Sequence, residues 1–80
     1  MASAYLHNMN LCLELVKRVE FTTEDEIKAE KKMLKDTAYH VKTSMIAFSE
    51  NTQAGRDELE VAYKLFCKQV DKVKLQVTNA

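Results

Sequence analysis

Apolar residues recur at helical spacing along three stretches of the chain, residues 3–20, 23–49 and 56–77. Within each stretch the main apolar positions are three or four residues apart, which places them on one face of an α-helix. The residues expected to share a core on this basis are Leu6, Met9, Leu13, Val16, Leu34, Val41, Met45, Phe48, Leu59, Phe66, Val70 and Val73. The pattern therefore predicts an all-α protein with three amphipathic helices.

Local signals mark the boundaries between the expected helices. Thr23, followed three residues later by Glu26, matches a capping box, in which the Thr hydroxyl accepts from the backbone N–H of the Glu and the Glu side chain reaches back. The stretch 50–55 contains the only glycine of the chain, Gly55, and we expect it to form the second loop. The chain has no proline, the residue that most strongly breaks helices, so the two longer helices can continue without a proline kink.

Short loops between amphipathic helices bring consecutive helices side by side in antiparallel order. We therefore expect residues 1–80 to form a single domain, an antiparallel up-down-up three-helix bundle. The alternative is a long helical hairpin of the second and third helices that dimerises, with the first helix packed across it. A chain of 80 residues buries only about 60–65% of its unfolded surface, which leaves little material for a deep substrate pocket.

Charge and cysteine content narrow the class of protein. Lys plus Arg and Asp plus Glu both number 12, so the formal net charge is zero. Nucleic-acid-binding proteins obtain much of their affinity from an excess of basic residues, so we do not expect a dedicated nucleic-acid-binding protein. The apolar runs are too short for a membrane span or a signal peptide. Cys12 and Cys67 lie among apolar residues, so we expect both to be reduced, buried thiols. The alternative is a disulfide or a reactive thiol. We expect a cytoplasmic protein.

The residues that usually carry catalysis form no recognisable arrangement. His7 and His40 are the two histidines, and we expect both on the surface. His40 has Ser44 four residues away, but no oxyanion-binding motif accompanies the pair. No His, Cys or acidic residues stand at the spacing of metal ligands. We therefore expect no enzyme, no cofactor and no metal site.

Four apolar residues lie away from the main apolar faces of their helices. Val61 and Leu65 are four residues apart on the third helix, and Leu11 and Leu15 are four apart on the first. Contiguous exposed apolar residues mark interaction surfaces, although a helix with two neighbours has a face wide enough to absorb Leu15 and Leu65. We assign these four residues to partner binding.

Five lysines gather on one flank of the second helix at 100° per residue. They are Lys28, Lys31, Lys32, Lys35 and Lys42, which we call the lysine strip. The strip is either a solvated flank or a surface for an acidic partner helix, anionic lipid or nucleic acid.

The leading functional hypothesis is a non-enzymatic helical protein–protein interaction domain, a docking or adaptor module within a larger cytosolic protein. Its partner would be another protein, bound through a helix or a helical surface. The first alternative is structural self-association, with a homodimer formed through the two longer helices. The second alternative is peripheral contact with an anionic membrane or nucleic acid through the lysine strip, and these are the partner classes we expect least.

Overall fold

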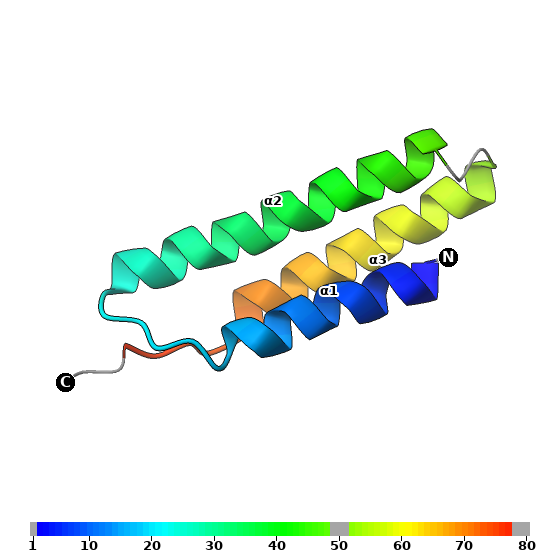
Figure 1. The fold of residues 1–80 in the computed structure, drawn as a ribbon. Helices are drawn as coiled ribbons and strands as arrows, with labels where there is room; N and C mark the ends of the chain where they lie inside the picture. Colours follow the sequence, from blue (N-terminus) through cyan, green and yellow to red (C-terminus); the bar gives the residue numbers. More distant parts are fainter. Residues whose placement is uncertain (1, 49–51, 78–80) are drawn as a thin grey trace.

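A computed structural model describes residues 2–48 and 52–77 of the chain. It contains three α-helices, α1 (Ala2–Val16), α2 (Glu24–Phe48) and α3 (Gln53–Lys72), which run alongside one another (Figure 1). α3 packs closely against both other helices, whereas α1 and α2 make fewer contacts with each other. The predicted all-α bundle of three helices is confirmed.

One face of each helix contributes to a common core. The buried apolar residues are Tyr5, Met9, Leu13, Val16, Phe21, Ile27, Leu34, Ala38, Leu59, Ala62, Phe66 and Val70. Because α3 has a neighbour on two sides, its residues Leu59, Phe66 and Val70 are completely buried. Most of the predicted core is found here, and the small residues Ala38 and Ala62 complete the faces of α2 and α3.

Some residues predicted to be in the core are only partly buried, and one is not buried at all. Leu6, Val41 and Met45 are half-buried and pack against the edge of the core. The prediction is wrong for Phe48, whose side chain is 87% exposed. The Tyr5 hydroxyl donates to the Ala38 carbonyl. Tyr5 lies within one turn of the first residue of α1, whereas α2 continues for more than two turns past Ala38. The end of α2 therefore has no α1 beside it.

The first helix ends at Val16, four residues before the predicted end at residue 20. Its last turn tightens, because the N–H groups of Arg18 and Val19 donate to carbonyls three residues earlier, at 3.1 and 3.0 Å. This turn directs the following segment inward, so that Phe21 is buried with 4% of its surface exposed. Phe21 thus enters the core from a loop, where helical periodicity could not predict it.

The third helix also ends early, at Lys72 and not at Val77. Val73 has an extended backbone (φ −65°, ψ 137°) and is half-buried, so it is neither a helical nor a fully buried core residue. The chain then runs past the loop between α1 and α2, where Val77 forms an isolated parallel bridge with Phe21 (Figure 1). Leu75 lies in this extended segment and packs against the core.

The predicted capping box at the start of α2 is present, with one difference in its partners. The backbone N–H of Glu26 donates to the Thr23 hydroxyl at 3.1 Å, as expected. The Glu26 carboxylate, however, accepts from the backbone N–H (3.3 Å) and the hydroxyl of Thr22, one residue earlier than the motif implies. The hydrogen bonds from the Thr22 hydroxyl and N–H lower the pKa of Glu26. The N-terminus of α2 is therefore satisfied by its own sequence.

The third helix begins at Gln53, before the predicted start at residue 56. Thr52 is its N-cap, and the Thr52 hydroxyl accepts from the backbone N–H of Gly55 at 3.0 Å. Gly55 was assigned to the loop because glycine usually breaks helices, but here it occupies the first turn. Residues 49–51, which include the predicted end of the second helix and part of the predicted loop, lie outside the described residues. None of the described helices is long and apolar enough to cross a membrane.

Candidate functional site

The four apolar residues assigned to partner binding are exposed but do not form one surface. Their side chains are 58% (Val61), 45% (Leu65), 50% (Leu11) and 63% (Leu15) exposed, so the core absorbs neither Leu15 nor Leu65. Val61 and Leu65 line a groove between α1 and α3, whereas Leu15 lines a different groove between α1 and α2. Leu11 lies outside both of these grooves. Binding by these residues stays a prediction, now divided over two sides of the bundle.

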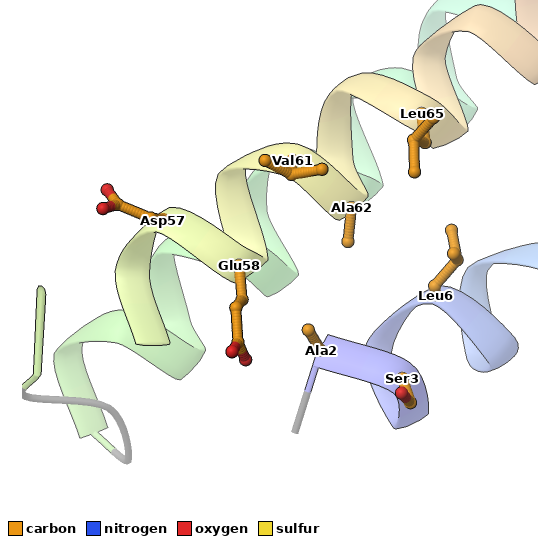
Figure 2. A pocket seen from close by; sticks show the side chains of 8 residues that line it. All are labelled: Ala2, Ser3, Leu6, Asp57, Glu58, Val61, Ala62 and Leu65. Carbon is orange, nitrogen blue, oxygen red and sulfur yellow. The ribbon is translucent and has the colours of Figure 1, made fainter. Parts of the chain in front are cut away.

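The α1–α3 groove is an open, mainly apolar hollow of about 520 Å³. Its lining residues are Ala2, Ser3, Leu6, Asp57, Glu58, Val61, Ala62 and Leu65 (Figure 2). Figure 2 shows Leu6 of α1 pointing toward Leu65 of α3, with Ala62 directed into the space between the helices. Glu58 points toward Ala2 at the end of the groove nearest the start of α3. The groove therefore has an apolar end at Leu6 and Leu65 and an acidic end, where Glu58 points toward α1 and Asp57 points outward.

The α1–α2 groove is smaller, about 250 Å³, and is the more apolar of the two. Its lining residues are Met9, Cys12, Leu15, Val16, Glu30, Met33, Leu34, Thr37 and Phe66. Since α1 and α2 both pack on α3 and less on each other, the core residue Phe66 of α3 forms part of the groove lining. Met33 is 60% exposed on the α2 wall. The sequence offered no sign of Met33, because a single apolar residue among lysines has no periodicity.

The outward face of α1 carries almost no charge. Glu14 is the only Asp, Glu, Lys or Arg in this helix, while α2 and α3 carry charged residues throughout. Leu11, Leu15, Asn8 and His7 are nevertheless exposed on it. Helices on the surface of a soluble domain normally place charged residues outward, and an uncharged helix is usually covered. This signal was present in the sequence and would have singled out α1 as a whole.

Lys42, the last member of the lysine strip, is buried between α2 and α3. Its Nζ lies 2.6 Å from Oε2 of Glu60, and 4.8 and 4.6 Å from the ring centres of Tyr39 and Tyr63. The ammonium is thus paired with a carboxylate and enclosed by two aromatic faces, which offsets the cost of removing it from water. Lys42 is a structural residue of the α2–α3 interface.

Two further lysines of the strip also hold α3. Nζ of Lys35 lies 2.6 Å from Oδ1 of Asp71, and this hydrogen bond raises the pKa of Lys35. Nζ of Lys31 donates to the carbonyl of Val73 at 3.1 Å, which places a positive charge at the C-terminal end of α3. The strip was expected to be solvated or ligand-binding along its length. Three of its five members instead join two helices of the same chain, which leaves Lys28 and Lys32 as its exposed part.

Buried Tyr5 and half-buried Tyr63 and Cys67 form a small cluster between the helices. The hydroxyl of Tyr5 donates to the Ala38 carbonyl at 2.7 Å, and burial, with smaller contributions from Cys67, Tyr63 and Glu60, raises the pKa of Tyr5 to about 12. A hydrogen bond with Cys67, together with burial, raises the pKa of Tyr63 to about 12. Both phenols therefore stay protonated at neutral pH, where they can hold the helices together but cannot act as bases.

The remaining candidates for chemistry are dispersed. His7 and His40 are exposed, as predicted. Cys12 and Cys67 are free thiols and are half-buried, less buried than their apolar surroundings in the sequence suggested. Within residues 2–48 and 52–77, no three His, Cys, Asp or Glu side chains converge to hold a metal ion.

Comparison with protein families, curated proteins and solved structures finds no match to this chain. The surface features that bear on function are the two grooves, the uncharged face of α1 and the distribution of charge around them.

Proposed function

We propose that this chain is a non-enzymatic helical interaction domain, an up-down-up three-helix bundle that docks a partner helix in the α1–α3 groove. The observation that carries the proposal is the pair Val61 and Leu65, both about half exposed and one helical turn apart beside an apolar hollow. Anchors at positions i and i+4 are what a helix-in-groove interface uses.

Contacts between the helices support the up-down-up arrangement. Tyr5 of α1 meets Ala38 of α2, and Leu15, ten residues later, lines a groove with Glu30, which precedes Ala38. These helices therefore run in opposite directions.

The same reasoning applies to α2 and α3. Lys35 pairs with Asp71, whereas Lys42, later in the chain, pairs with Glu60, which comes earlier. In this arrangement α1 and α3 run parallel, so the start of α1 lies beside the start of α3, at the acidic end of the α1–α3 groove.

Charge defines the class of partner. Asp57 and Glu58 stand at one end of the groove, and the apolar residues Leu6 and Leu65 stand at the other. The complementary ligand is an amphipathic helix of another protein, with two apolar residues one turn apart and a Lys or Arg about one turn beyond them. The apolar pair would supply affinity, and the acidic end would set orientation and the association rate. The free thiols support a reducing compartment, and we place the domain in the cytoplasm.

The test is a paired set of variants used for affinity capture from cell extract, followed by titration of the captured helix as a peptide. We expect Val61→Ser with Leu65→Ser to remove about 2–3 kcal/mol of binding free energy, a loss of roughly 30- to 150-fold in affinity. Helicity should stay unchanged, because neither side chain belongs to the buried core. The matched control is Leu11→Ser with Leu15→Ser, which removes equally exposed residues outside this groove. Unfolding of the first variant, or equal loss with both, would mean that the groove is not the docking site.

Titration in increasing salt adds a second readout. Asp57→Asn with Glu58→Gln should slow association and reduce its dependence on salt, and should leave the dissociation rate nearly constant. The lysine-strip alternatives have less support, since Lys31, Lys35 and Lys42 are already engaged within the chain.

A further inference from the structure

We propose that a second copy of this chain binds the α1–α2 side of the bundle, and that the chain forms a weak homodimer through α1. This surface is separate from the α1–α3 groove, so the dimer does not depend on the proposed partner site. It is also different from a dimer formed by α2 and α3, because those two helices already use their facing sides for each other.

The shape of the α1–α2 side suits a copy of itself. Leu11 projects from the outer face of α1, and next to it the groove lined by Leu15, Cys12 and Met33 is open. A surface that carries a ridge and a hollow side by side can pair with itself about a two-fold axis, with each ridge entering the other hollow. In an antiparallel pairing of the two α1 helices, Leu11 of one copy lies at the level of Leu15 of the other.

The hollow has room for such a ridge. A cavity of about 150 Å³ already accepts a group the size of benzene. The α1–α2 groove measures about 250 Å³, which suffices for a leucine side chain and part of a second one. Its lining includes the accessible edges of the core residues Met9 and Leu34, so the entering side chain would meet apolar atoms on several sides.

Charge also favours a second copy as the occupant. Glu30 is the one charged residue in the lining of this groove, and Glu14, on the flank of α1, is already paired with Lys17 at 2.8 Å. Pairing the face with itself therefore opposes few like charges. The net charge of the chain is zero, so two copies do not repel each other at a distance. A foreign partner selected by charge would find no pattern here to recognise, in contrast to the acidic end of the α1–α3 groove.

The available area indicates a weak dimer. Leu11, Leu15 and Met33 are each half to two-thirds exposed, and a side chain of this size carries on the order of 100 Å² of apolar surface. They therefore offer roughly 200 Å² of apolar side-chain surface per copy, which with polar neighbours stays below the roughly 1,200 Å² of total area that stable interfaces begin to bury. We expect a dissociation constant of roughly 10–500 µM.

The first measurement is the mass of the full chain by sedimentation equilibrium, from about 5 µM to about 1 mM. The wild-type mass should rise from monomer toward dimer over this range. Leu15→Glu on α1 and Met33→Glu on α2 should each raise the dissociation constant about 100-fold or more, because each places a charge in the apolar contact. The matched control is Val61→Glu, which adds the same charge to an equally exposed apolar residue of the α1–α3 groove and should dimerise like the wild type. Circular dichroism checks that all three variants keep their helices.

The alkylation rates of the two thiols show which surface of the chain is covered in the dimer. Cys12 lines the α1–α2 groove, whereas Cys67 lies outside it and hydrogen bonds with Tyr63, which lies beside lysines of α2. Alkylation of Cys12 should slow roughly twofold when half of the chains are dimeric, and alkylation of Cys67 should not change with concentration.

A chain that stays monomeric at about 1 mM overturns the homodimer. So does a dimer that Val61→Glu disrupts and Leu15→Glu does not. The partner-capture experiment does not depend on either of these results. If the Val61 and Leu65 variants lose a captured partner, the proposed function stands even when the homodimer is overturned, so the two proposals fail independently.

Discussion

Replacing Tyr5 by Phe removes one oxygen atom from the centre of the bundle and offers a direct test of the packing between α1 and α2. The hydroxyl is buried and donates to the Ala38 carbonyl at 2.7 Å. A buried neutral hydrogen bond contributes about 1 kcal/mol, and Phe leaves almost no cavity because the ring is retained. At neutral pH we expect Tyr5→Phe to lower the free energy of unfolding by about 1 kcal/mol, and the melting temperature by about 4–8 °C.

The pH dependence of this difference is the sharper part of the prediction. Burial raises the pKa of Tyr5 to about 12 in the folded chain, while an unfolded tyrosine titrates near its ordinary value of 10. Between these two values the unfolded chain has lost the phenolic proton and the folded chain retains it. The unfolded state then binds fewer protons, so the stability of the wild type falls as the pH rises.

The two effects oppose each other and should cross. By about pH 11 the titration of Tyr5 has removed roughly 1.4 kcal/mol from the wild type and nothing from the variant. This loss is similar to the advantage that the hydroxyl gives at neutral pH. We therefore expect the wild type to be the more stable protein below about pH 11, and Tyr5→Phe to be the more stable above it.

Urea unfolding at a series of pH values from about 8 to 11.5, followed by circular dichroism, measures the difference directly. Comparing two chains that differ in one hydroxyl cancels the titration of the lysines. Ile27→Val is a suitable control, since it removes one buried methyl group at a cost of about 1 kcal/mol and titrates nothing. A difference between wild type and Tyr5→Phe that stays constant with pH, as the Ile27→Val difference should, would refute the buried, raised-pKa role of Tyr5.

Two other substitutions test how buried polar groups contribute. Glu60→Gln leaves the Lys42 ammonium between two tyrosine rings without its carboxylate, and should cost about 1–2 kcal/mol, whereas Lys42→Met removes the buried charge itself and should cost less than about 1 kcal/mol. Chemical denaturation gives the order, and a larger loss for Lys42→Met would show that the charge itself stabilises the fold. Oδ1 of Asn10 is buried with no hydrogen-bond partner among the described residues, so Asn10→Ala should raise stability by about 0.5–1.5 kcal/mol; a lower melting temperature would reveal a partner for this oxygen.

The helices and much of their buried faces were predictable, because periodicity is a local property of the chain. The positions of Leu13, Leu34, Leu59 and Phe66 follow from spacing alone, and all four are in the core. The N-terminus of α2 was equally predictable, since a capping box is written within four residues. The prediction failed where the apolar periodicity of a helix extends beyond its neighbouring helix. At Phe48 the apolar face of α2 continues, but α1 is not there to cover it.

The candidate surfaces were predictable in part. Helical angles place Val61, Leu65, Leu11 and Leu15 away from the main apolar faces, but they left open whether Leu15 and Leu65 are covered by a neighbouring helix. The structure shows all four exposed. The sequence could not predict that Val61 and Leu65 line one groove and Leu15 another. The grooves form only when α1 packs closely on α3 and less closely on α2.

The amino-acid order alone specifies that this chain is helical, where its three helices lie to within a few residues, and which face of each is apolar. Such properties depend on residues three or four positions apart, which local hydrogen bonding and spacing specify. The roles of the charged and aromatic residues, in contrast, depend on how the helices pack together. In the folded chain Lys31, Lys35 and Lys42 form contacts between α2 and α3 instead of an exposed basic strip, and Phe21, which lies in a loop, is buried in the core. The lysine contacts join residues 18 to 42 positions apart. The angle of a residue around its helix gives the direction of its side chain but not the group that the side chain will contact.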